Sequence, residues 1–277
     1  MKCFQSLCIL ILIAIFVLNY TSLGVPHSQL VVLKGESGGV PFEEDLVRFY
    51  SFPETDESYT PDSSSYEING DINKDTPNEP EWAGSAASKI SVGSYFFNGT
   101  SDYIGIYTNI LAQSSPSEGT FSCWIRIDQD TEQFLLGSEY GSATALAFSI
   151  ENLKVAVSGS YNAEGLTFWK VESDTVLSTG TWYQVGFTAD SSDYKIFVNG
   201  TNTSLTVSAA NPGFWFDKWA PHPSEVWIGD VVLGRRRDNL KWLDGYFATV
   251  KFYGRALSTG EYYEAYSYEL DELQPLE

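Results

Sequence analysis

The chain has few basic residues and almost no histidine. Lysine and arginine together number 16 against 36 aspartate and glutamate residues, which gives a formal net charge of −20 at pH 7. Such a surface repels nucleic acid phosphates and anionic membranes, so neither is expected as a partner. The two histidines, His27 and His222, are far apart in the sequence and form no His-Glu-x-x-His zinc motif.

Cysteine is scarce as well, and two of the three cysteines lie in an apolar N-terminal segment. A lysine precedes the apolar run from Leu7 to Leu18, and small residues follow up to Gly24. This pattern predicts a signal peptide over residues 1–24 and a secreted protein, extracellular or at the cell surface. The alternative is an uncleaved anchor, although a bilayer span needs ~20 apolar residues. No later segment is apolar enough to span a membrane. Cys123 then has no disulfide partner and is expected to be buried, with a reactive thiol as the alternative.

Helical periodicity is nearly absent too. Short runs rich in Val, Ile, Phe, Tyr and Trp recur between Gly, Asn, Asp and Ser, which predicts an all-β antiparallel jelly roll of two packed sheets. Asn-Gly pairs at Asn98 and Asn199 predict two-residue hairpin turns. Ser258 and Glu261 form a capping box at the start of one short helix, Thr259–Tyr268. The expected strands are Leu46–Phe52, Ser91–Phe97, Tyr103–Ile106, Gly119–Ile127, Phe134–Ser138, Ala145–Ile150, Lys154–Ser158, Trp182–Ala189, Tyr194–Val198, Glu225–Ile228 and Gly245–Phe252.

Six segments, taken in order, resemble a known family. They include the runs Y-F-F-N-G-T-S-D-Y-I, G-T-W-Y and K-I-F-V-N-G, and they are Leu46–Phe52, Tyr95–Ile104, Phe121–Ile125, Ser178–Val185, Tyr194–Gly200 and Leu243–Ser258. The chain resembles the laminin-G-like (LamG) domains of the concanavalin-A-like lectin/glucanase superfamily. Residues 45–268 would form this domain. Residues 25–44 would be an N-terminal strand with a Gly-rich tether, and residues 269–277 an acidic C-terminal tail.

The resemblance implies the jelly-roll fold but leaves the function open. The superfamily includes lectins, adhesion modules, glycosidases and structural domains. Glycosidases need two carboxylates beside the scissile bond, and in the glucanase branch they alternate along one strand as Glu-x-Asp-x-Glu. No predicted strand shows that pattern, so we do not expect an enzyme.

The resemblance also implies a calcium site, because many relatives bind calcium through oxygen ligands. The candidate ligands are Asp230 and Asp244. Pro53, Ala248 and Thr249 stand where relatives supply oxygen atoms, so any bound Ca²⁺ is expected to contribute little to stability. A carboxylate that caps a turn is the alternative role for Asp244.

An aromatic loop flanked by prolines supplies the first set of candidate ligand-binding residues, Trp215, Phe216 and Trp219. Aromatic faces stack on sugar rings and on other proteins. The alternative is a loop that folds back and fills the end of the sandwich, with Trp215 in the core.

A basic cluster supplies the second set, Arg235, Arg236 and Arg237. Clustered guanidiniums bind the carboxylates or sulfates of acidic glycans, and laminin-G-like domains often bind such glycans through loops. The alternative is that the three arginines neutralise nearby aspartates such as Asp244.

Three sequons of the mature chain predict N-glycosylation, at Asn98, Asn199 and Asn202. The first two asparagines also suit tight turns, so the motif alone does not establish modification. Asn199 and Asn202 are too close together for both to be occupied at once.

The N-terminal segment offers a last indication of function. A continuous apolar run suits a strand covered on both faces, and here it consists of Leu30, Val31, Val32 and Leu33. Such a strand can pair with a sheet edge of its own chain or of a neighbouring copy. The main hypothesis is a secreted, non-enzymatic module that binds glycans or proteins, glycoproteins included, at the cell surface or in the extracellular matrix. The alternative is a structural protein that polymerises into an extracellular filament through this strand.

Overall fold

The structure is a computed structural model that describes residues 40–84, 93–107, 118–140, 143–159, 168–216, 230–236 and 241–272. The chain divides into two units, Met1–Gly39 and Val40–Glu277. The predicted signal peptide and the strand Leu30–Leu33 lie outside the described residues. Within the second unit the folded domain begins at Val40, earlier than the expected residue 45, because Val40 and Phe42 pack against a buried cluster. No helix among the described residues is long and apolar enough to cross a membrane.

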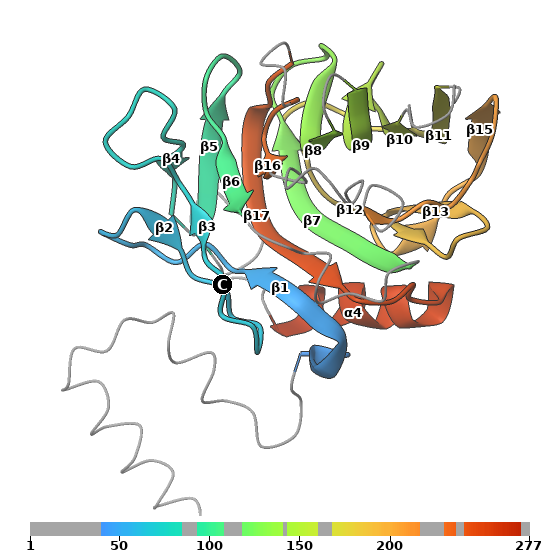
Figure 1. Cartoon of the computed structure of the whole chain (residues 1–277), viewed down its shortest axis with the longest axis horizontal. Coiled ribbons are helices and arrows are strands. Elements are labelled where there is room, and N and C mark those ends of the chain that lie inside the picture. The colour runs from blue at the N-terminus through green and yellow to red at the C-terminus, as the bar shows by residue number, and fades with distance from the viewer. Residues whose placement is uncertain are drawn as a thin grey trace, which may run out of the picture. The chain divides into compact units, whose positions relative to one another are not determined.

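The described residues form two antiparallel sheets (Figure 1). The eight-stranded sheet has the order β14-β13-β12-β7-β17-β5-β4, and β1 also pairs with β17. Its strands are β1 (Leu46–Tyr50), β4 (Glu81–Trp82), β5 (Ser94–Asn98), β7 (Gly119–Ile127), β12 (Trp182–Ala189), β13 (Tyr194–Val198), β14 (Thr201–Asn202) and β17 (Asp244–Tyr253).

The nine-stranded sheet has the order β15-β11-β10-β9-β8-β16-β6-β3-β2. A short 3-10 turn, Glu43–Asp45, precedes β1 of the other sheet. The strands of the nine-stranded sheet are β2 (Tyr59–Thr60), β3 (Gly70–Asp71), β6 (Ile104–Tyr107), β8 (Gln133–Tyr140), β9 (Ala143–Glu151), β10 (Lys154–Gly159), β11 (Trp169–Val176), β15 (Leu205–Ser208) and β16 (Asp230–Leu233).

The core lies between the two sheets. Phe121 of β7 is at its centre, with ring centroids 4.9 Å from Phe252, 5.5 Å from Phe148 and 6.0 Å from Phe187. Phe148 comes from the nine-stranded sheet and the other three rings from the eight-stranded sheet, so this cluster joins the layers. Edge-to-face aromatic pairs of this kind add about 1 kcal/mol each beyond the apolar area that they bury.

A β-bulge at Thr249 lets β17 pair with two strands in turn along one edge, while β7 pairs along its other edge. The register of β17 against β7 shifts between Ala248 and Val250, and Thr249 has φ 37°. The first half of β17 pairs with β5, and the second half pairs with β1. An extra residue bends a strand and increases its twist, which is how one strand can run along two neighbours.

The outer face of the eight-stranded sheet is covered by α4 (Thr259–Glu272; Figure 1). The Tyr262 ring stacks on Phe197 at 3.9 Å, and the Tyr266 ring on Trp124 at 6.0 Å. A Cβ at Gly186 would lie 2.2 Å from the Phe121 carbonyl oxygen and 2.3 Å from the Tyr262 hydroxyl, so glycine is required at this contact between the helix and the sheet. The central strands are therefore buried on both faces and read as nearly continuous apolar runs.

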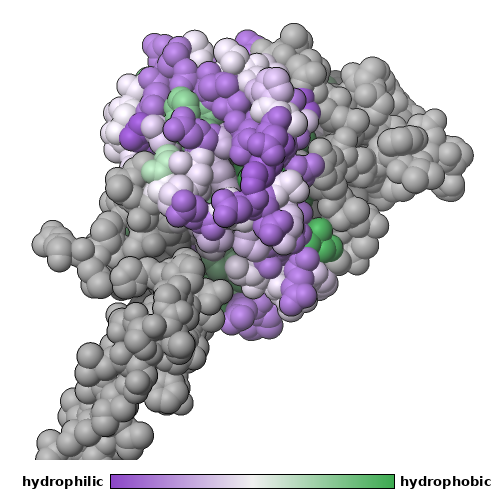
Figure 2. Space-filling model, turned by 90° about the vertical axis from the view of Figure 1, so that its left-hand side faces the viewer, coloured by the Kyte–Doolittle hydropathy of each residue, from purple (hydrophilic) through white to green (hydrophobic). Residues whose placement is uncertain are grey.

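The loop between β1 and β3 is held by a single buried carboxylate. Asp62 accepts hydrogen bonds from the backbone N–H groups of Phe49, Ser64 and Ile68 at 2.8, 2.9 and 3.0 Å. Its Oδ2 lies 4.0 Å from Arg48, and both side chains are fully buried. Figure 2 shows the face that carries β2, β3 and β4 to be mainly hydrophilic, so this ordered loop offers no broad apolar surface.

The structure confirms the predicted fold class and corrects details. Three strands have the predicted bounds, Gly119–Ile127, Trp182–Ala189 and Tyr194–Val198. Asn199 and Gly200 form the predicted two-residue hairpin turn, both with positive φ. Asn98 instead ends β5, from which the chain crosses to β6 in the other sheet.

The prediction missed three longer strands and the end of the helix. Strands β11, β15 and β16 were not expected, and the predicted strand Glu225–Ile228 lies outside the described residues. The helix begins at Thr259 as predicted, and its capping box is present: Ser258 N–H donates to Glu261 at 2.8 Å and Glu261 N–H to the Ser258 hydroxyl at 3.3 Å. However, α4 continues to Glu272, so residue 269 does not begin an acidic tail.

Candidate functional site

The predicted ligand-binding residues lie at opposite ends of the sandwich. At one end β7 finishes at Ile127 beside Gly245, and Asp244 pairs with Asn98; we call this the basic-loop end. At the other end Gly119 pairs with Ala189, where β7 begins and β12 finishes; we call this the plug end. The two predicted clusters therefore do not form one site.

The aromatic loop fills the plug end. The Trp215 side chain is fully buried and Phe216 is 1% exposed, with the Trp215 ring 5.8 Å from Phe187. A Cβ on Gly119 would lie 2.1 Å from the Trp215 ring, so the indole rests directly on the backbone of β7. The structure corrects the prediction that Trp215 and Phe216 contact a ligand; the alternative, a loop that closes the sandwich, is what it shows. Trp219 lies outside the described residues.

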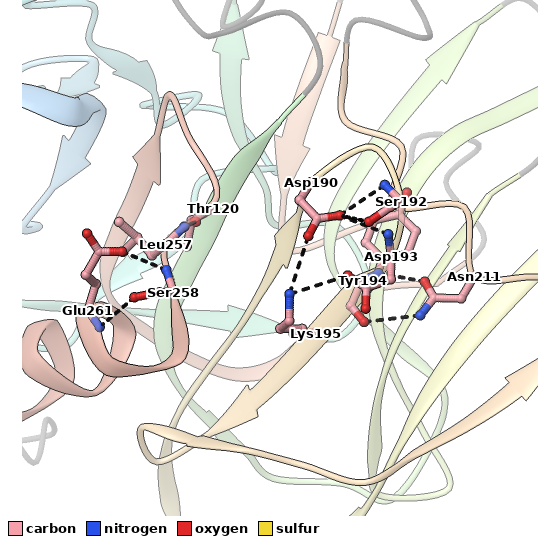
Figure 3. Close-up of polar contacts among 10 residues, drawn as sticks. All are labelled: Thr120, Asp190, Ser192, Asp193, Tyr194, Lys195, Asn211, Leu257, Ser258 and Glu261. Atoms are coloured by element: carbon pink, nitrogen blue, oxygen red, sulfur yellow. Dashed lines mark hydrogen bonds and ion pairs between the residues drawn. The ribbon is translucent and has the colours of Figure 1, made fainter.

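Polar contacts hold this loop in place (Figure 3). The Asn211 amide bonds both ways to the Tyr194 backbone: Oδ1 accepts from N–H at 2.6 Å and Nδ2 donates to the carbonyl at 3.2 Å. The Tyr194 hydroxyl donates to the carbonyl of Phe214, and Gly213 has φ 58° where a side chain would meet Asp193. These contacts fix the Trp215 backbone, so the ring enters the core in one position.

The neighbouring turn between β12 and β13 is built on Asp190. Its Oδ1 accepts hydrogen bonds from Ser192 N–H, the Ser192 hydroxyl and Asp193 N–H at 3.0, 2.6 and 3.0 Å. Burial raises the pKa of Asp190, but these bonds and the Lys195 ammonium 3.4 Å away hold it well below its ordinary value. The polar groups of this turn are thus satisfied within the protein, whereas the buried indole N–H groups of Trp215 and Trp169 have no hydrogen-bond partner among the described residues.

The basic loop, residues 234–243, connects β16 to β17 at the opposite end. The Arg235 guanidinium lies 3.7 Å from the centroid of the Tyr103 ring and 5.4 Å from that of Trp242. Arg236 lies 5.8 Å from the Phe134 ring. Cation–π contacts of this kind stabilise by about 0.5–2 kcal/mol. Both arginines are half-buried, and Arg237 lies outside the described residues.

Backbone contacts hold the described ends of the basic loop to each other and to the nine-stranded sheet. Gly234 N–H donates to the Leu135 carbonyl at 3.1 Å, and Leu243 N–H donates to the Gly234 carbonyl at 2.8 Å. Gly234 has φ 86°, and a Cβ there would lie 2.4 Å from the Phe97 ring. Arg236 N–H donates to the Lys241 carbonyl at 2.8 Å. The guanidiniums are therefore presented from a rigid base.

Acidic and amide side chains lie next to the basic loop. Asp244 Oδ2 accepts from Gln129 Nε2 at 2.6 Å, and the Asp244 N–H donates to Gln133 Oε1 at 2.8 Å. Burial, and then the charge of Asp128, raise the pKa of Asp244. The Lys241 ammonium pairs with Glu132 at 2.8 Å. The Asp244 carboxylate thus bonds to the Gln129 side chain, and its backbone N–H to that of Gln133; the turn-capping role, the alternative to calcium binding, stays a prediction.

The structure does not bring the two predicted calcium ligands into one strand pair. Asp230 begins β16 in the nine-stranded sheet, whereas Asp244 begins β17 in the eight-stranded sheet. Among the residues that the structure describes, no three His, Cys, Asp or Glu side chains are grouped so as to hold a metal ion. A calcium site remains a prediction from the resemblance alone.

Strand β11 carries two alternating carboxylates, but Val176 stands where the third carboxylate of the Glu-x-Asp-x-Glu pattern would be. Glu172 and Asp174 are two residues apart on β11. Glu172 pairs with Lys170 at 2.7 Å and with Lys154 at 3.5 Å, and Asp174 accepts from the Thr206 hydroxyl at 2.8 Å. Both carboxylates are thus engaged with neighbouring strands. Two carboxylates on one strand are not by themselves a catalytic acid and base, because that role needs one protonated and one ionised group.

The Cys123 thiol is fully buried within the core. Burial raises its pKa well above the ordinary value, with Glu269 as a second cause. Since the thiolate is the reactive form, this cysteine is the inert hydrophobe that was expected.

Sequence reasoning missed the aromatic partners of the arginines. Tyr103 belongs to the D-Y-I run, and Trp242 follows the arginine cluster by five residues from Arg237. A tryptophan in the same loop as an arginine cluster is the signal that was available, since Arg is the cation most often stacked on such rings.

The fold has known counterparts at low sequence identity. The receptor-binding domain of botulinum neurotoxin D matches with a TM-score of 0.56 and 13% identity over 81% of this chain and 53% of that one. A complex of the toxin's ligand-binding domain with N-acetylneuraminic acid gives a TM-score of 0.56 and 13% identity, over 81% and 51%. Trypanosoma rangeli sialidase in complex with sialic acid gives 0.54 and 16%, over 85% and 34%.

Each match covers only part of the length of the related protein. The chain spans about half of the toxin domains and a third of the sialidase. At such identities the likeness shows the fold alone. No curated protein matches the sequence. Residues 97–261, more than half of the chain, match the family model for the laminin-G type of the concanavalin A-like lectin/glucanases superfamily. The chain therefore belongs to the concanavalin A-like lectin/glucanases superfamily.

Proposed function

We propose that this protein is a secreted, non-enzymatic module that binds acidic glycans, or glycoproteins that carry them, through the basic loop. The carrying observation is the placement of Arg235 and Arg236 against aromatic rings at one end of the sandwich. In a chain of net charge −20, these two guanidiniums are neighbours in sequence on a loop whose described ends are held by backbone hydrogen bonds.

The chemistry of a stacked guanidinium supports an anionic ligand. A ring contacts the flat face of the group, while its N–H donors point outward in the plane and match a carboxylate or sulfate bidentately. A ring such as Tyr103 or Trp242 also offers a face to a sugar. Arginine and aromatic side chains in one loop thus supply both parts of acidic-glycan recognition.

The structurally similar proteins and the sequence also support the proposal, but less directly. The toxin domain was crystallised with N-acetylneuraminic acid and the sialidase with sialic acid, both carboxylated sugars. The predicted signal peptide would bring the chain to the extracellular space, where such glycans occur. A binding role without catalysis fits β11, whose carboxylates are engaged with Lys154, Lys170 and Thr206.

The test is binding of the secreted protein to 3′-sialyllactose and to heparin, which separate carboxylate from sulfate recognition. Arg236→Gln is the informative variant, since its ring contact is longer than that of Arg235 and its loss disturbs the loop less. Losing a charge-assisted hydrogen bond of about 1.5–3 kcal/mol should weaken binding by roughly 10- to 100-fold. Binding should also weaken with salt.

Lys195→Gln is the matched control, because it removes the same charge at the plug end. It should leave binding unchanged. The proposal fails if the wild-type protein binds neither probe at low salt. It also fails if both variants weaken binding equally, since net charge rather than the basic loop would then be responsible.

A further inference from the structure

The three sequons occupy structurally different positions, and these differences decide which asparagine can carry a glycan in the folded protein. Attachment joins a sugar C1 to the side-chain Nδ2 and replaces one of its two hydrogens. The folded protein must therefore tolerate a bulky group on Nδ2. The inference rests on entry into a secretory pathway, which is part of the proposed function.

The Asn98 amide is part of the turn that leaves β5. Its Nδ2 donates to the Ser101 hydroxyl at 2.9 Å and to the Asp102 carboxylate at 2.7 Å. Its Oδ1 accepts from the Thr100 N–H, the Thr100 hydroxyl and the Ser101 N–H at 2.8, 2.9 and 2.9 Å. Asp102 is 4% exposed, so a glycan here would remove a donor from a buried carboxylate.

The Asn199 side chain sits inside its hairpin turn. Its Oδ1 accepts from Gln184 N–H at 3.0 Å, and Asn199 N–H donates to the Gln184 carbonyl at 2.7 Å. A Cβ on the adjacent Gly200 would lie 2.4 Å from the Tyr266 ring, so α4 packs directly over this turn. Asn199 is half-buried, so a glycan on its Nδ2 would have to fit beside the helix that packs over this turn.

Asn202 differs from both in its side-chain contacts, although Asn98 is exposed as well. Asn202 is exposed and ends the two-residue edge strand β14, where its backbone pairs with Phe197. Among the described residues its side chain makes no hydrogen bond or ion pair. The sequon hydroxyl, that of Ser204, also belongs to an exposed residue. Beyond Ser204 the chain continues into β15, the edge of the other sheet.

We propose that Asn202 is the N-glycosylation site of this protein, and that Asn98 and Asn199 stay unmodified. The donor is an oligosaccharide on a polyprenyl diphosphate. The Asn202 Nδ2–C1 bond forms, the bond from C1 to the diphosphate oxygen breaks, the amide nitrogen loses one proton and the polyprenyl diphosphate leaves. The glycan projects from the open side of the sandwich, where β14 and β15 are the two sheet edges.

The experiment is expression of the full chain in a eukaryotic secretory host, with the mass of the secreted protein measured before and after an amide-cleaving endoglycosidase. Three matched variants remove one sequon hydroxyl each: Thr100→Ala, Thr201→Ala and Ser204→Ala. Wild type, T100A and T201A should lose the mass of one glycan on digestion, and S204A none. Digestion in ¹⁸O water converts the modified asparagine to labelled aspartate and should place the label at Asn202.

Secretion level and circular dichroism check that each variant folds, and Asn202→Gln provides a second way to remove the site. A glycan on S204A, or its loss in T100A or T201A, overturns the inference. So does wild-type protein that reaches the medium without a glycan, a result that leaves secretion and glycan binding intact. Retention of wild type inside the cell contradicts the proposed secretion instead, and a residue-202 label on that retained protein would still support the site.

Discussion

The buried ion pair between Lys251 and Glu269 should be the most sensitive electrostatic contact of the fold. The Lys251 ammonium lies 2.7 Å from one Glu269 oxygen, and the Trp124 indole N–H donates to the other at 2.6 Å. The two side chains are 1% and 2% exposed, between α4 and the eight-stranded sheet. Burial lowers the pKa of Lys251, but Glu269 more than offsets this, so the pKa lies above its ordinary value.

Removing one partner should cost far more than removing both. Lys251→Met leaves a buried carboxylate with one neutral donor, and Glu269→Gln leaves a buried ammonium. Each should lower the free energy of unfolding by about 3–5 kcal/mol. The double variant keeps an acceptor for the indole and contains no buried charge, so it should lie within about 1–2 kcal/mol of wild type. Urea denaturation of all four proteins at pH 7, followed by tryptophan fluorescence and circular dichroism, gives the coupling energy.

The pH dependence of one variant provides an independent check. In Glu269→Gln the main group that raises the pKa of Lys251 is removed and burial, the largest cause, dominates, so the folded-state pKa of this ammonium should fall below the unfolded value. The unfolded state then binds more protons, and stability should rise with pH as the buried amine is deprotonated. Additive single effects, or a Lys251→Met loss below about 1 kcal/mol, would show that the pair is not the buried contact described.

Four further outcomes are expected. Trp215→Ala should lower the free energy of unfolding by about 3–5 kcal/mol. Gly119→Ala should destabilise the wild-type protein, because its Cβ would meet the Trp215 ring, but should be nearly neutral in the Trp215→Ala variant. The Arg255 hydrogen bond lowers the pKa of Glu261 to about 2, so the stability difference between wild type and Glu261→Gln should be full above pH 4.5 and vanish as pH falls through about 2. Deleting the segment up to Gly39 should preserve the melting temperature. If the wild-type protein forms polymers and the truncated protein does not, assembly through the N-terminal strand is supported. If both proteins have the same size in solution, that assembly is refuted. A chelator should shift the melting temperature by only a few degrees, and a large drop would reveal a calcium site.

The fold class could be predicted because its strongest signals are local. Gly119–Ile127 and Trp182–Ala189 are long runs of β-branched and aromatic residues bounded by turn residues, and both have the predicted bounds. The Ser258–Glu261 capping box acts over three residues and was found for the same reason. By contrast, β11 begins with one aromatic but continues through Lys170, Glu172 and Asp174, because its outer face carries ion pairs rather than apolar contacts.

The sequence identified the loops of interest but not the role of each, since residues clustered in a loop can either fill the core or lie at the surface. Trp215 and Arg235 were selected by clustering in loops, yet the first closes the core and the second lies at the rim. Their roles differ because each side chain packs against a different part of the fold. Gly119 has no Cβ, and this lets the Trp215 indole lie against β7. No local sequence pattern links this glycine to a loop almost a hundred residues later.

Glu269 shows why a buried charge is hard to recognise in a sequence. Tyr262, Ala265 and Glu269 follow helical spacing, and all three are buried. A glutamate in that row breaks the apolar periodicity; the helix was expected to end at Tyr268, and Glu269 itself was assigned to the acidic tail. The same interruption occurs in β17, where Lys251 stands between buried Val250 and Phe252. A lone cation within an apolar strand and a lone anion in register with an apolar helical row each imply an oppositely charged partner, because an unpaired buried charge is too costly to keep. Applied to both segments together, this argument pairs Lys251 with Glu269 and extends α4 over the sheet.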